Sequence, residues 1–210
     1  VDELDLGAVL CDHYSGVHAA TTDLLARGHR KIALITGSMD VRSTRERLRA
    51  YRDAFADAGA DPEDALLSIG QFTSDFSKSE VIRLMSRRPE PTALITGGVL
   101  TTAGAIRALS QLGRRPGEDV ALVALDEWPL FDVSTPSLAS VARDPNEIGT
   151  TAARLMLDML GGGEATTITV PTTFTPRESL TTIRGARRSG GTRSASTRTP
   201  ASPRRVAARG

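Results

Sequence analysis

The five residues Ala33-Leu34-Ile35-Thr36-Gly37 recur unchanged, sixty positions later, as Ala93-Leu94-Ile95-Thr96-Gly97. Each copy is an apolar run that stops at glycine and lies between two segments with helical periodicity. Such runs are typical of strands buried on both faces, as in a parallel sheet covered by helices. Open parallel sheets bind ligands beyond the carboxyl ends of their strands, so the loops after these runs are candidate sites.

The rest of the chain continues this alternation of strands and helices. The spacing of apolar residues predicts helices over 16–27, 43–59, 77–88, 101–112 and 146–160, and strands over 31–36, 66–69, 92–96, 120–125, 138–141 and 166–173. Ser43 with Glu46, and Ser77 with Glu80, have the spacing of capping boxes at two helix starts. The order indicates an α/β protein with doubly wound parallel sheets.

Composition limits the classes of protein that remain. The 210 residues are 40% apolar and 24% charged, as is usual for globular proteins. No apolar run could span a bilayer, and the start of the chain lacks the features of a signal peptide, so we expect a cytoplasmic protein without a membrane partner. Cys11 is the only cysteine, and the three histidines lack zinc-site spacing, so no metal site is expected.

Charge is distributed unevenly along the chain. Residues 184–210 contain eight arginines and no acid, whereas residues 1–183 contain 18 Lys and Arg against 25 Asp and Glu. An acidic body disfavours direct contact with nucleic acid, whose binding depends on cationic side chains. The tail has little to bury and is predicted to be disordered, either as a solvated terminus or as a nonspecific nucleic-acid contact.

Motifs give little support to catalysis. The chain has no P-loop, no dinucleotide-binding glycine fingerprint and no Gly-x-Ser-x-Gly elbow. We therefore expect no catalytic residues and no cofactor. His29 lies in a tight turn between a helix and a strand, where a structural role is favoured over a catalytic one.

A different set of residues follows the predicted strand ends. Arg47, Phe72 and Asp126 come after three of these strands and should face one crevice. A cation, a carboxylate and an aromatic ring suit the binding of a small polar ligand. Other interpretations stay open, because Arg47 could be solvated, Phe72 could belong to the core and Asp126 could cap a turn. Trp128 is a further ligand-binding candidate that equally fits a hinge or packing position.

At this point the chain resembles the effector-binding region of the LacI/GalR family of bacterial transcription regulators, over nearly all of residues 8–180. The order and spacing of several pieces carry the resemblance, namely residues 24–33, 43–51, 91–96, 104–113, 116–126, 135–138, 148–149 and 177–179. The resemblance implies a periplasmic-binding-protein-like architecture of two lobes, with ligand-contact roles for Asp12, Ser43, Arg47, Phe72 and Asp126.

The implied lobes divide the sequence into segments. Residues 1–13 would be a remnant of an incomplete first lobe, 14–142 the second lobe, 143–170 a return to the first lobe, and 171–183 the end of the second, before the basic tail 184–210. The amino-terminal helix-turn-helix that this family carries upstream would be absent, so the chain is expected to be a carboxyl-terminal fragment. Without most of the first-lobe sheet, the stripe of Ile148, Leu155 and Met159 is expected to face water.

The resemblance also implies a function. We expect a homodimeric repressor whose effector, a sugar or related metabolite, controls operator binding by the missing head. A solute-binding protein of a sugar transport system is the alternative, and an enzyme on a doubly wound sheet is a third class. One departure concerns the ligand, because Val99 stands where the family usually has Asp or Asn.

Overall fold

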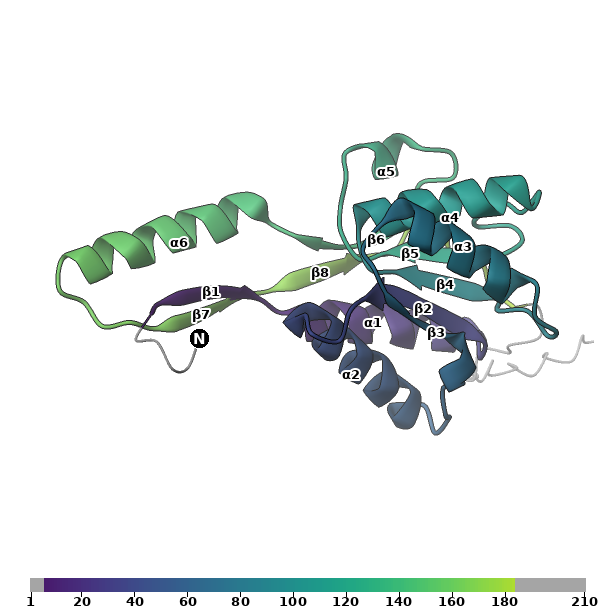
Figure 1. Cartoon of the computed structure of the whole chain (residues 1–210), viewed down its shortest axis with the longest axis horizontal. Helices are drawn as coiled ribbons and strands as arrows, with labels where there is room; N and C mark the ends of the chain where they lie inside the picture. Colours follow the sequence, from purple (N-terminus) through teal and green to yellow (C-terminus); the bar gives the residue numbers. More distant parts are fainter. Residues whose placement is uncertain (1–5, 184–210) are drawn as a thin grey trace, which may run out of the picture.

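The computed structural model describes residues 6–183, so the predicted disordered tail lies outside the described residues. A large α/β body carries a smaller layer that projects from one end (Figure 1). The elements of the body are α1 (His13–Ala26), β2 (Ile32–Gly37), α2 (Arg42–Asp57), η1 (Asp64–Leu66), β3 (Leu67–Gly70), α3 (Ser74–Met85), β4 (Ala93–Thr96), α4 (Val99–Gln111), β5 (Ala121–Ala124), α5 (Leu130–Val133), β6 (Ala139–Arg143) and β8 (Thr172–Thr175). The projecting layer contains β1 (Ala8–Cys11), α6 (Pro145–Leu160) and β7 (Thr167–Val170).

The body is built on a six-stranded sheet with the order β3-β2-β4-β5-β6-β8. The first five strands are parallel, and β8 pairs antiparallel with β6 at one edge. The two repeats pair directly with one another, since Ile32 lies opposite Ala93 and Ile35 opposite Thr96. The predicted doubly wound α/β fold is therefore confirmed, with one antiparallel edge strand.

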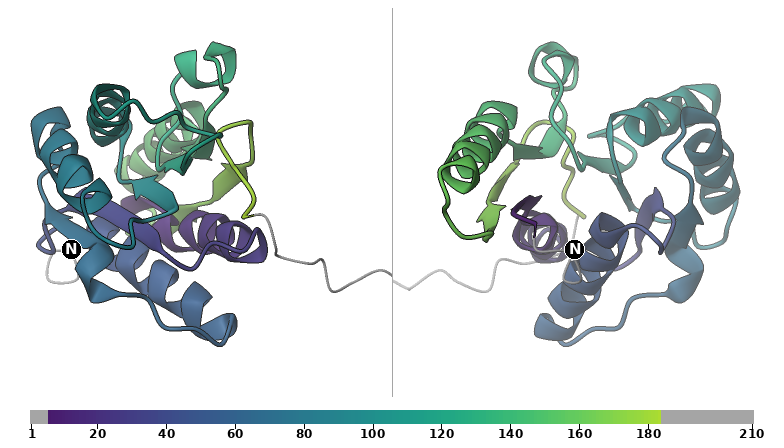
Figure 2. Two further views of the ribbon diagram at one scale, coloured as in Figure 1. Left: turned by 90° about the vertical axis from the view of Figure 1, so that its right-hand side faces the viewer. Right: turned by 60° about the vertical axis from the view of Figure 1, so that its left-hand side comes forward.

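Helices cover both faces of this sheet, as Figure 2 shows. Alternate residues of β2 enter two different cores: Ile32 and Leu34 pack with residues of α1 and α2, whereas Ala33 and Ile35 pack with residues of α3 and α4. All six residues of β2 are buried as a result. Burying one such aliphatic side chain contributes about 1.5–3 kcal/mol, which explains why these runs are continuously apolar.

Both predicted capping boxes are wrong. Helix α2 begins at Arg42 after Val41, which makes no side-chain capping bond, so Ser43 lies inside the first turn. Helix α3 is capped by Thr73, whose hydroxyl accepts the Phe76 backbone N–H. Ser77 is buried within α3 and donates to the Thr101 carbonyl at 2.7 Å, a tertiary contact that sequence spacing does not reveal.

Helix α4 also differs from its prediction. It begins at Val99, two residues early, and its buried face is formed by Ala105, Ala108 and Leu109. Ile106 and Leu112, whose helical spacing with Leu109 predicts that they share its buried face, are both exposed. Gly104 and the alanines allow close packing here, because a Cβ at Gly104 would approach the Ser74 backbone of α3.

The projecting layer is a parallel pair, β1 and β7, with α6 packed against it. The single strand predicted over 166–173 is wrong, since it is divided at Pro171 between β7 of this pair and β8 of the body. Proline lacks the N–H that a continuous ladder requires. Three single residues connect the layer to the body: Asp12, Asp144 and Pro171.

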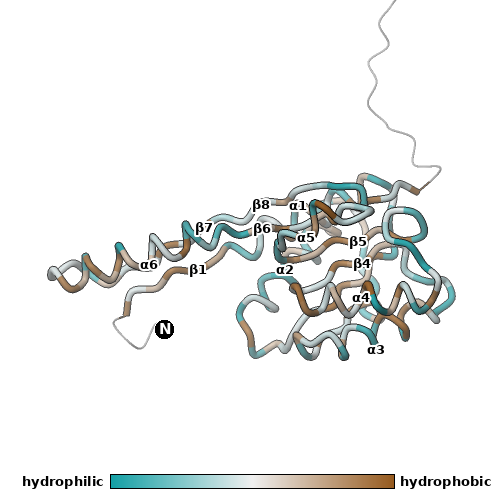
Figure 3. Tube along the Cα trace, turned by 90° about the horizontal axis from the view of Figure 1, so that it is seen from above, coloured by the Kyte–Doolittle hydropathy of each residue, from teal (hydrophilic) through white to brown (hydrophobic). Residues whose placement is uncertain are grey.

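Exposure on α6 does not follow the predicted stripe. Leu155 is only 7% exposed, and Ile148 and Met159 are half-buried, so the expectation that these three face water is wrong. Leu155 and Met159 pack over Gly7, where a Cβ would meet both side chains. The exposed apolar residues are instead Met156, Leu157 and Leu160, and apolar segments alternate along α6 in Figure 3. None of the helices within residues 6–183 has the length and hydropathy needed to span a bilayer.

Candidate functional site

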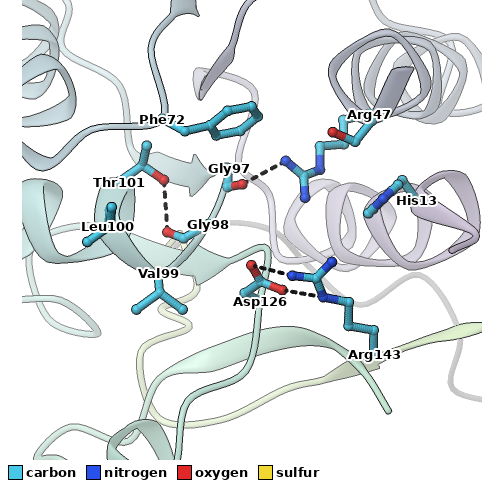
Figure 4. A pocket seen from close by; sticks show the side chains of 11 residues that line it. His13, Arg47, Phe72, Gly97, Gly98, Val99, Leu100, Thr101, Asp126 and Arg143 are labelled. Carbon is cyan, nitrogen blue, oxygen red and sulfur yellow. Dashed lines mark hydrogen bonds and ion pairs between the residues drawn. The ribbon is translucent and has the colours of Figure 1, made fainter. Parts of the chain in front are cut away.

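A pocket of about 350 Å³ opens at the carboxyl ends of the parallel strands (Figure 4). Four of the six predicted ligand-binding residues, Ser43, Arg47, Phe72 and Asp126, line it. The other lining residues are His13, Gly97, Gly98, Val99, Leu100, Thr101 and Arg143. Side chains from α2 and from the loops after β3, β4 and β5 thus meet in one place.

Arg47 is the most buried charged residue of the pocket, with an exposure of 6%. Its Nη1 donates to the Gly97 carbonyl oxygen at 2.6 Å, and its guanidinium lies 5.7 Å from the centre of the Phe72 ring. Burial lowers the pKa of Arg47 to about 10, which leaves it charged at neutral pH. Gly37 makes room for this arrangement, because a Cβ there would collide with the Phe72 ring.

Asp126 forms the floor of the pocket with Arg143. The Arg143 Nε lies 3.0 Å from Asp126 Oδ1, and Nη2 donates to Oδ2 at 3.4 Å. Burial raises the pKa of Asp126, and the charges of Arg143 and Arg47 oppose that rise. The carboxylate is therefore held by one arginine and faces a second.

His13 lies beside both arginines at the start of α1 (Figure 4). Burial and the positive charges of Arg47 and Arg143 lower the pKa of His13 to about 4. The imidazole is thus neutral at pH 7, where one ring nitrogen donates and the other accepts a hydrogen bond.

Asp12 and Trp128 are not among the lining residues. Asp12 caps α1, where its carboxylate accepts the backbone N–H groups of Tyr14 and Ser15 at 3.0 and 2.9 Å. Burial acts to raise its pKa, but the hydrogen bonds from Ser15 and Tyr14 hold that pKa below its usual value. Trp128 is 45% exposed and packs edge-on against the Phe131 ring. A direct ligand role for either residue remains a prediction.

Sequence reasoning missed His13 and Arg143 in the pocket. Asp126 was selected because it follows the carboxyl end of a parallel strand. The same rule applies to Arg143, which is the last residue of the parallel strand β6. The predicted end of that strand at Val141 left Arg143 outside the candidate set. His13 offered a weaker signal, since it begins a helix at its amino end.

The arrangement suits binding of a polar ligand. No cluster of three metal-ligating side chains is found in residues 6–183. His29 is fully buried away from the pocket, with its ring nitrogens 2.9 Å from Thr92 Oγ1 and 3.0 Å from the Thr181 carbonyl oxygen. This pairing fits a structural role that ties the turn after α1 to the carboxyl-terminal segment.

Comparison with known proteins identifies one family. The model of the periplasmic binding protein-like domain matches residues 21–180. The HTH-type transcriptional regulator CelR of Thermobifida fusca is 35% identical over 77% of this chain and 48% of its own length. The regulator AscG of Escherichia coli is 31% identical over 75% of this chain and 47% of its own length. The chain spans about half the length of these curated relatives, which are transcriptional regulators and not enzymes.

Solved structures give the same result. A complex of the regulator CelR with cellobiose superposes with a TM-score of 0.78 at 33% identity, covering 84% of this chain and 54% of that one. A putative ribose operon repressor from Burkholderia thailandensis superposes with a TM-score of 0.74 at 33% identity, covering 81% of this chain and 63% of that one.

Proposed function

The chain belongs to the periplasmic-binding-protein-like domains of LacI-family transcriptional regulators, and from this premise we propose that it is the ligand-sensing part of a repressor. Its effector is a sugar or a related small metabolite. The full protein acts in the cytoplasm as a homodimer, and it binds operator DNA through a helix-turn-helix domain. The lobes divide at the boundaries predicted above, so the pocket lies where they meet.

The observation that carries this proposal is the meeting of Arg47, Phe72 and Asp126 around one pocket. These residues lie far apart in the sequence and follow different strands, yet they supply a cation, a ring and a carboxylate to a shared space. Its volume of about 350 Å³ is within the range of small-molecule sites. The cellobiose bound to the related CelR structure supports a sugar-like effector.

The position of the pocket supports a signalling mechanism. His13 follows Asp12, and Arg143 precedes Asp144, so two lining residues adjoin connections to the projecting layer. A ligand that contacts them more favourably in one arrangement of the two parts shifts the population toward that arrangement. This shift is the signal that would reach a DNA-binding head.

Substitution of the two central charges tests the proposal. We expect Arg47→Ala to weaken effector binding at least a hundredfold, because a buried charged donor to the ligand is lost. We expect Asp126→Ala to weaken it by a similar factor, because Arg143 loses the carboxylate that holds it at the pocket. Both should change the free energy of unfolding by only about 1 kcal/mol. Arg47→Ala loses the hydrogen bond to the Gly97 carbonyl but also removes a buried charge without an ion pair in residues 6–183, and Asp126→Ala loses one partly exposed pair. Isothermal titration calorimetry against a panel including cellobiose and ribose measures the affinities.

Matched controls separate the site from general effects of charge. Arg107→Ala and Asp64→Ala remove the same side chains from exposed surface positions outside the pocket. Both control variants should bind like the parent. Unchanged affinity in Arg47→Ala and Asp126→Ala would reject the assignment of the site.

A further inference from the structure

The pocket carries an excess positive charge. Within residues 6–183 Arg47 makes one hydrogen bond, from Nη1 to the Gly97 carbonyl, and its buried Nε has no partner there. Its nearest sequence neighbour with a negative charge, Glu46, is paired with Arg42 at 2.5 Å. Buried charges are normally paired, because removing them from water without a partner is costly. Within residues 6–183 the guanidinium of Arg47 therefore makes no ion pair, and only the more distant carboxylates of Asp126 and Glu46 act on its charge.

The other charged groups of the pocket do not balance Arg47. The Asp126 carboxylate is committed to Arg143 through contacts of 3.0 and 3.4 Å, so this pair is close to neutral. His13 adds no negative charge and is uncharged at pH 7. The lining residues thus sum to two guanidinium groups against one carboxylate.

The opposite wall carries no charged side chain. Figure 4 places Leu100, Val99 and Thr101 across the pocket from the arginines and His13, and the Phe72 ring lies beside Arg47. Val99 is the first residue of α4 and offers no acceptor to the site. A ligand that fits both walls needs an anionic end and a carbon skeleton that can lie against side chains without charge.

We propose that the effector carries an anionic group, a carboxylate or a phosphate, that binds between Arg47 and Arg143 with its carbon skeleton toward Phe72 and Val99. The planar guanidinium matches both groups through paired hydrogen bonds. This inference rests on the proposed function and narrows it from sugars in general to acidic or phosphorylated sugars and related hydroxy acids.

Pairs of ligands that differ only in an anionic group test the inference on the unmodified chain. Calorimetry would compare D-glucose with D-glucuronate and glucose 6-phosphate, D-galactose with D-galacturonate, and D-ribose with ribose 5-phosphate, with inorganic phosphate as a probe that has no skeleton. We expect an anionic member to bind at least tenfold more tightly than its neutral parent, and this preference to fall at high salt because screening weakens charge interactions. The carboxylate and phosphate arms distinguish the two anions.

A variant adds a test within the pocket. Val99→Asp introduces a carboxylate at the first position of a helix, where it is compatible with folding, and it should weaken anion binding at least tenfold. The uncharged and nearly isosteric Val99→Asn should keep the preference for the anionic member. If neutral sugars alone bind, with affinity that depends on Arg47, this inference is overturned and the proposed function stands. Absence of binding by every sugar and by phosphate would count against both.

Discussion

Strand β2 of the body and strand β7 of the projecting layer have similar β-forming sequences and very different surroundings. All six residues of β2 are buried, whereas three of the four residues of β7 are exposed. Helices cover both faces of the large sheet, but the described residues place only α6 against the small one (Figure 1). Burial here depends on the number of covering layers rather than on strand composition.

The same contrast appears in the helices. Helix α2 buries seven residues against the body, including Tyr51 and Phe55. Helix α6 has the same length of 16 residues and buries only Leu155. A two-stranded sheet is marginal without further packing, so the projecting layer should be the less stable of the two regions.

The largest expected effect contrasts the two cores directly. Leu94→Ala opens a cavity in a fully buried strand and should lower the free energy of unfolding by about 2–5 kcal/mol. Leu155→Ala removes the same atoms from the layer and should cost about 1–2 kcal/mol, because fewer neighbours surround them. Urea denaturation measures both values. Hydrogen exchange should show faster opening of α6 in Leu155→Ala while the protection of β4 is kept. Equal losses would show that the regions are equally packed.

A smaller effect on the free energy of unfolding is expected from His13, which lies at the junction between the body and the projecting layer. The pKa of His13 is about 4 in the folded protein and about 6.5 in an unfolded chain. Between these values the unfolded state binds more protons, so the free energy of unfolding should fall as the pH falls from about 6.5 to about 4. A fully buried group would give about 3 kcal/mol, and solvent screening at this partly exposed position reduces our expectation to about 1 kcal/mol.

Urea denaturation at pH 7 and pH 5 checks this dependence. His13→Gln should flatten the difference, because glutamine does not titrate. His18→Gln, which changes a half-buried histidine of the same helix outside the pocket, is the comparison variant that shows whether any loss of pH dependence is particular to position 13. A parent and His13→Gln variant with identical pH dependence would contradict the environment assigned to His13.

The smallest effect on stability is expected at the exposed face of α6. Leu157 is 64% exposed, so Leu157→Ser should change the free energy of unfolding by less than about 0.5 kcal/mol. It should nevertheless reduce self-association, because it removes part of an exposed apolar surface. Light scattering over a range of protein concentrations measures this, and Arg154→Ser on the same helix is the control. Strong destabilisation by Leu157→Ser would mean that this side chain packs against the layer.

The sequence predicted the strands of the body better than the caps of its helices. The strands at 31–36 and 92–96 are observed at Ile32–Gly37 and Ala93–Thr96, because burial on both faces forces an unbroken apolar run. The match of the periplasmic binding protein-like domain to residues 21–180, together with the similarity to the regulators CelR and AscG, confirms the resemblance to LacI/GalR regulators. The caps at Ser43 and Ser77 failed because a spacing does not say whether a hydroxyl turns to its own helix or to a neighbour.

Some errors had a visible signal in the sequence. Pro171 marked the division between β7 and β8, because proline interrupts a ladder. The meeting of Arg47, Phe72 and Asp126 followed from the rule on strand ends. The pairing of Asp126 with Arg143 could not be predicted from that rule, because it depends on how far β6 extends toward its carboxyl end. The low exposure of Leu155 depended on a small sheet whose two strands lie about 160 residues apart in the chain.

The three single-residue connections, Asp12, Asp144 and Pro171, have a mechanical consequence. Asp12 and Asp144 are each tied to the first turn of the next helix by capping bonds, and the ring of Pro171 fixes one of its own backbone angles. Any rotation of the projecting layer relative to the body must therefore occur about very few backbone torsion angles. Helix α6 then acts as a lever about 24 Å long, at 1.5 Å per residue. A turn of about 10° at its base would displace the far end by about 4 Å, so a small torsional change beside the pocket is amplified at a distance.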